Sequence, residues 1–62
     1  MEYKIELIKL GKTQADVVRT MLERGIKVDP SELSLALGGR QRPKHQMLRE
    51  KTEEIIEEWK KG

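Results

Sequence analysis

The strongest chemical signal in the sequence is a short block of cationic side chains. Residues 40–51 contain five cations and one acid, a net charge of +4: Arg40, Arg42, Lys44, Arg49 and Lys51 against Glu50. Residues 1–35 have no net charge, and residues 53–61 have a net charge of −2. A basic block between neutral and acidic neighbours indicates a surface that contacts anions. A solvated loop and helix start would carry the same charges, so this pattern alone leaves both interpretations open.

Catalysis has no comparable signal. The chain has 62 residues, no cysteine and a single histidine, His45, which we expect at the surface as a phosphate donor at most. Without a nucleophile–base pair or a cluster of metal ligands, we expect no enzyme, no metal and no cofactor. So short a chain can hardly enclose a pocket for a small-molecule substrate. The two aromatic residues, Tyr3 and Trp59, are too few to stack single-stranded nucleic acid.

The location follows from hydropathy. No apolar run approaches the roughly 18 residues of a membrane span, and the N-terminus alternates charged and apolar residues. We therefore expect a cytoplasmic protein with no membrane partner.

The first half of the chain predicts two helices. Residues 1–10 alternate partly like a strand, but the chain offers no second strand to pair with, so we expect a helix that ends at Gly11. Thr13 can cap a second helix, because Asp16 follows three residues later. Gly25 can end that helix in a left-handed conformation, and Ile26 can pack back on it.

The second half predicts two more. Asp29 precedes Pro30 as an N-cap, and Gly38-Gly39 ends a short helix. A polar connector leads to a long amphipathic helix over about 44–61, with one apolar stripe: Leu48, Thr52, Ile55, Ile56 and Trp59. The sequence therefore predicts a single all-α domain of four helices over residues 1–62.

Two short helices joined by a connector, over about 13–39, are typical of a helix-turn-helix, although any small bundle can contain such a hairpin. Two runs resemble phage-repressor/Cro-type helix-turn-helix DNA-binding proteins. They are Leu7 to Arg19, which contains Gly-x-Thr-Gln, and Val28 to Gly39, which resembles the recognition helix and its following turn. The chain departs from that family in having Val18 at a usually small position and about five extra residues near 23–27.

The resemblance implies a set of DNA-contacting residues. Gln14 would bond a phosphate at the start of the second helix. Pro30, Ser31, Ser34 and Leu35 would face the major groove, while Leu33 and Leu37 would be buried. Arg40, Gln41, Arg42 and Lys44 would supply donors from the connector and the next helix start. Glu32 could reach cytosine N4, but a helix-capping role is the preferred interpretation.

These observations favour a sequence-selective duplex DNA-binding protein, a small transcriptional regulator of the phage or mobile-element type. It would act as a homodimer, formed in solution or only on DNA, with Leu48, Ile55 and Trp59 at the interface. Trp59 could equally cover the core of one chain. The alternative function is a non-catalytic adaptor that binds another protein and never DNA.

Overall fold

The computed structural model describes residues 2–62 and contains four α-helices and no strand within that range. The helices are α1 (Tyr3–Leu10), α2 (Gln14–Glu23), α3 (Pro30–Leu37) and α4 (Pro43–Lys61). The all-α prediction is confirmed, and only Met1 of the first predicted helix lies outside the described residues. Within residues 2–62, no helix has the length and apolar character needed to cross a bilayer.

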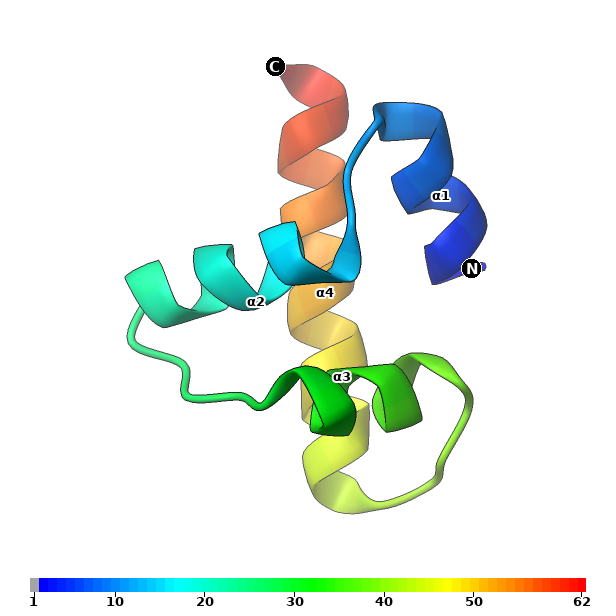
Figure 1. The fold of residues 1–62 in the computed structure, drawn as a ribbon, viewed down its shortest axis with the longest axis vertical. Coiled ribbons are helices and arrows are strands. Elements are labelled where there is room, and N and C mark those ends of the chain that lie inside the picture. Colours follow the sequence, from blue (N-terminus) through cyan, green and yellow to red (C-terminus); the bar gives the residue numbers. More distant parts are fainter. Residues whose placement is uncertain (1) are drawn as a thin grey trace.

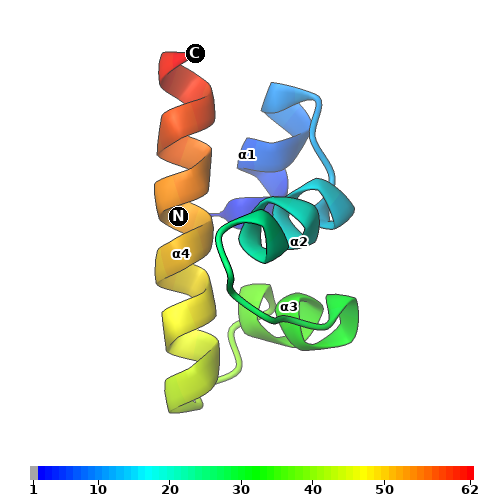
Figure 2. The same cartoon turned by 90° about the vertical axis from the view of Figure 1, so that its left-hand side faces the viewer.

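The long helix α4 organises the other three. It runs the length of the molecule, and α1, α2 and α3 lie along one side of it (Figures 1 and 2). Helix α3 lies beside the N-terminal turns of α4, and α1 lies toward the C-terminal end, where Glu6 pairs with Lys60. The core between them consists of Leu7, Val17, Val18, Met21, Val28, Leu33, Ala36, Leu48, Ile55 and Ile56.

The apolar stripe of α4 is used inside a single chain. Leu48 is 0% exposed and Ile55 is 1% exposed, because both side chains face the three shorter helices. The prediction that these two residues form a dimer interface is therefore wrong for this fold: a second copy cannot reach them while the chain is folded. Trp59 is half-buried against the core, with the Lys12 ammonium 5.2 Å from the centre of its ring.

The start of α2 follows the predicted capping pattern. The Asp16 backbone N–H donates to Thr13 Oγ1 at 3.3 Å, and the Thr13 N–H donates to Asp16 Oδ2 at 2.8 Å. Helix α3 starts differently, since Asp29 occupies the N-cap position but its side chain makes no capping hydrogen bond. Pro30 at the first helical position removes one N–H that would otherwise lack a partner.

This difference between the two helix starts is testable. We expect Thr13→Ala to lower the free energy of unfolding by about 1 kcal/mol, because it removes the hydrogen bonds that the Thr13 hydroxyl makes with the Asp16 N–H and carboxylate in the cap. Asp29→Ala should change it by less than about 0.5 kcal/mol, since no such bond is lost. Urea unfolding followed by circular dichroism measures both. Equal losses for the two variants would show that Asp29 caps α3 in solution.

The connector between α2 and α3 takes up the extra residues. Gly25 has φ 79°, which favours glycine, and the Ile26 N–H donates to the Met21 carbonyl at 2.8 Å. This is a Schellman ending, so α2 stops at Glu23 and residues 24–29 form the turn. Ile26 packs on the core as predicted, and Val28 is buried. Residues 24–27 of the segment that the sequence marked as additional therefore lie in the turn and not in α2.

Candidate nucleic-acid interface

The sequence-predicted groove residues share the outer side of α3. Pro30, Ser31, Ser34 and Leu35 are all exposed. The opposite side carries Leu33 and Ala36, both fully buried, and the half-buried Leu37. This burial pattern follows from the helical repeat, which places residues three or four apart on one face. Helix α3 therefore has one packed face and one face of hydroxyls and a leucine open to solvent.

Four exposed cations line hollows that include Pro30 or Leu35 of that open face; together we call them the basic rim. They are Lys27, Arg40, Arg42 and Lys44. Two hollows flank α3: one includes Lys27, Pro30 and Lys44, and the other includes Leu35, Arg40, Arg42 and Lys44. Because Lys44 borders both hollows, the rim continues around the start of α4. None of the four cations makes an ion pair with residues 2–62, so all four are open to an external anion.

The remaining predicted contact residues lie apart from these hollows. Gln14 is half-buried and borders a third hollow, which it shares with Ile8 and Lys12 at the junction of α1 and α2. Gln41 is exposed in the connector but lines neither hollow beside α3. Sequence reasoning missed Lys27, because it lies in the widened turn that the family resemblance does not cover.

The basic block of the sequence divides in two in the structure. Arg40, Arg42 and Lys44 join the rim, whereas Arg49 donates hydrogen bonds to the carbonyls of Ala36 and Arg40. Lys51 pairs with Glu54 one turn further along α4, at 3.4 Å. Three of the five cations therefore remain for an anion, and the other two have partners within the chain.

The burial of His45 contradicts the prediction that it is a surface residue. It is 3% exposed, and its Nε2 lies 2.7 Å from Glu32 Oε2. An ionised carboxylate only accepts hydrogen bonds, so Nε2 carries the proton and donates. This bond holds the pKa of the Glu32 carboxyl below its usual range, and the Lys44 charge adds to the effect. Glu32 therefore links α3 to α4 and does not cap its own helix.

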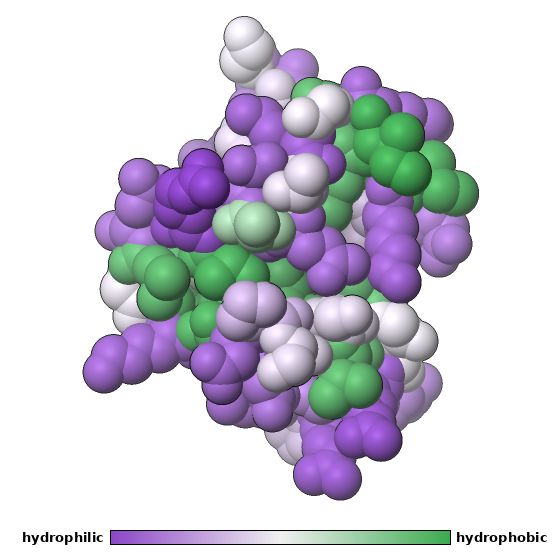
Figure 3. All heavy atoms as spheres, viewed as in Figure 1, coloured by the Kyte–Doolittle hydropathy of each residue, from purple (hydrophilic) through white to green (hydrophobic). Residues whose placement is uncertain are grey.

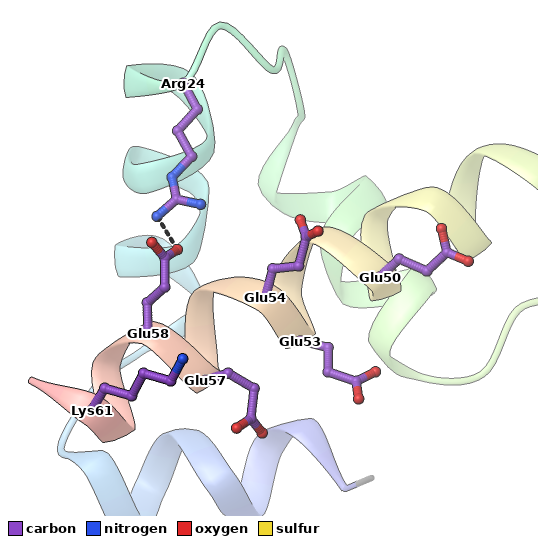
Figure 4. A pocket seen from close by; sticks show the side chains of 7 residues that line it. All are labelled: Arg24, Glu50, Glu53, Glu54, Glu57, Glu58 and Lys61. Carbon is purple, nitrogen blue, oxygen red and sulfur yellow. Dashed lines mark hydrogen bonds and ion pairs between the residues drawn. The ribbon is translucent and has the colours of Figure 1, made fainter.

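A surface of opposite charge lies further along α4. Five glutamates line a shallow hollow with Arg24 and Lys61: Glu50, Glu53, Glu54, Glu57 and Glu58. Figure 4 shows the glutamates projecting from α4, with Arg24, the residue that follows α2, paired to Glu58. A polyanion would be attracted to the rim and repelled by this acidic surface, which favours one orientation of approach.

The surface that carries α3 is mainly hydrophilic. In Figure 3 green side chains appear in separate places over α1, over the C-terminal end of α2 and over α3, with purple between them. The exposed apolar residues Ile5 and Ile8, Leu22 and Leu35 lie on these three helices. Such scattered apolar residues are ordinary on a protein surface. Chemically, the arrangement around α3 offers cations for phosphates and hydroxyls for groups that donate or accept hydrogen bonds.

Comparison with known protein families, curated proteins and solved structures finds no match to this chain.

Proposed function

We propose that this chain is a sequence-selective duplex DNA-binding protein that inserts α3 into the major groove. The observation that carries the proposal is the open face of α3 with the basic rim beside it. The resemblance to phage-repressor/Cro-type proteins over α2 and α3 supports the same assignment. A small transcriptional regulator of the phage or mobile-element type is the role that agrees with such binding.

The contacts divide into two kinds. The basic rim holds the phosphate backbone, which supplies affinity but no sequence information. Base reading falls to Ser31, Ser34 and Leu35 on the open face. Serine hydroxyls bond several bases, and a leucine can contact the methyl group of thymine. Because α3 has no Arg, Asn or Gln, discrimination by one copy is weak.

Weak reading by one copy favours two copies on a two-fold site. Two α3 helices on half-sites one helical turn apart would double the number of base contacts. With Leu48 and Ile55 buried, Trp59 is the one residue of the predicted interface that keeps an exposed edge. We propose that pairing occurs on DNA, where the duplex itself holds the two copies close together.

Salt dependence tests the role of the basic rim. If its four cations neutralise about four phosphates, the slope of log affinity against log salt is expected near −3 to −4. Arg40→Ala with Arg42→Ala should flatten that slope by up to about two. Fluorescence anisotropy with a mixed-sequence duplex measures both slopes.

A control pair removes the same charge elsewhere. Lys9→Ala with Lys61→Ala takes two cations from α1 and from the C-terminal end of α4, and should leave the slope unchanged. If both double variants flatten the salt slope equally, DNA affinity depends on the total charge of the protein and not on the position of the basic rim. No binding at about 50 mM salt, where phosphate contacts are strong, would contradict DNA binding itself.

The adaptor function keeps one observation in its favour. Ile8 is 77% exposed on α1, and Ile5 beside it is half-exposed, on a helix that the basic rim does not include. A protein partner could cover this pair. Two results together would support the adaptor interpretation: duplex DNA does not bind, and Ile8→Glu abolishes capture of a cellular protein.

A further inference from the structure

The end of α3 determines where the basic connector begins. Gly39 has φ 97°, and its N–H donates to the Ala36 carbonyl at 3.2 Å. The Arg40 N–H donates to the Leu35 carbonyl, also at 3.2 Å. These two bonds form a Schellman ending, which turns the chain sharply out of the helix. Residues 40–42 then lead directly to Pro43, the first residue of α4.

Arg49 reinforces this ending from another helix. Its Nη1 lies 3.0 Å from the Ala36 carbonyl oxygen and 2.6 Å from the Arg40 carbonyl oxygen. The guanidinium therefore bridges the last turn of α3 and the first residue of the connector. A positive charge is favourable there, because the C-terminal carbonyls of a helix carry partial negative charge and lack partners in the helix.

The same face of α4 contacts the other end of α3. His45 lies four residues before Arg49, one helical turn away, and bonds Glu32 in the first turn of α3. The N-terminal half of α4 thus holds α3 at both ends, by a side-chain pair at the start and by the guanidinium at the finish. Of these two contacts, only the Arg49 contact includes the connector that carries Arg40 and Arg42.

We infer that Arg49 is a positioning residue, which fixes the end of α3 and the connector so that the basic rim meets phosphate in one geometry. The inference rests on the proposed DNA binding. Arg49 is half-buried and both its acceptors belong to the chain. Its charge is therefore used inside the protein, and it acts on DNA through the placement of Arg40 and Arg42. Bonds from a charged donor of this kind are stronger than those between neutral groups.

The free protein tests the positioning directly. In Arg49→Gln, amide hydrogen exchange at Gly39 and Arg40 is expected to rise roughly tenfold or more relative to amides in α2, because a charged hydrogen-bond donor is lost locally. Arg42→Gln is the matched control, since it removes an exposed arginine that has no partner among residues 2–62, and should leave this ratio unchanged. If Arg49→Gln does not fold, Arg49→Lys is measured instead. It keeps the charge but loses the planar fork, and the same local rise is expected.

DNA binding separates positioning from direct contact. Arg49→Gln should weaken duplex binding about tenfold with an unchanged salt slope, because the number of phosphates contacted stays the same. Arg42→Gln should instead lower the slope by about one. Unchanged exchange at Gly39 and Arg40, or a slope lowered by about one in Arg49→Gln, would overturn the inference. If the wild-type protein binds no duplex, the proposed function fails, while the exchange ratio still decides whether Arg49 holds the connector.

Discussion

Ile55→Ala is expected to leave the chain largely unfolded, whereas Ile8→Ala should leave it intact. Both variants make the same chemical change, but Ile55 is 1% exposed and Ile8 is 77% exposed. Truncating a buried isoleucine to alanine costs about 2–5 kcal/mol, since it leaves a cavity as well as losing apolar contact. The core of a chain this small rarely supplies more than about 3–5 kcal/mol. Urea unfolding of the two variants measures the difference.

The same pair of variants decides how the stripe of α4 is used. If the stripe joined two copies, Ile55→Ala would fold normally and only weaken self-association. Sedimentation equilibrium on the variant distinguishes the outcomes. A folded Ile55→Ala monomer of near wild-type stability would contradict the packing of α4 against α1, α2 and α3.

Ser34→Glu is expected to weaken duplex binding by about a hundredfold or more, because it places a carboxylate among phosphates, where like charges repel strongly. Ser34 is exposed on the open face of α3, and its backbone carbonyl accepts from the Gly38 N–H whatever side chain is present. The fold should therefore be kept, with a change in unfolding free energy within about 0.5 kcal/mol. Anisotropy titrations and urea unfolding give the two numbers.

Ser34→Gln is the matched control. Glutamine has the size of glutamate without its charge, so affinity should change far less, and any change in sequence preference should be confined to one base position. Equal losses of duplex affinity in Ser34→Glu and Ser34→Gln would show that the size of the new side chain, and not its charge, weakens binding. Unchanged binding by Ser34→Glu would mean that this face of α3 does not approach DNA.

The helix boundaries could be predicted because their signals are local. Gly11, Gly25 and Gly39 all have positive φ at the ends of helices, and Thr13 caps α2 with Asp16. These features depend on residues within one turn of each other, which the sequence displays directly. The exposure of Ser31 and Ser34 also agrees with the sequence, since helical spacing separates them from Leu33 and Ala36.

The features that were missed depend on contacts between helices. His45 is buried because the first turns of α4 pack on α3, and its partner Glu32 lies 13 positions earlier in the chain. Arg49 looked like part of a basic surface, but it bonds carbonyls of α3 and the connector. A linear pattern gives the face of a helix but not which neighbour covers it.

A chemical-shift titration of the labelled protein with duplex DNA, at low and at high salt, tests the central claim most directly. The DNA-binding account predicts that the largest amide shifts fall on residues 31–35, 40–42 and 44. They should shrink at high salt, as phosphate contacts weaken. Amides of Glu53, Glu54 and Glu57 on the acidic surface should barely move. Shifts centred on Ile5 and Ile8, or no shift at low salt, would contradict the claim that the open face of α3 within the basic rim binds DNA.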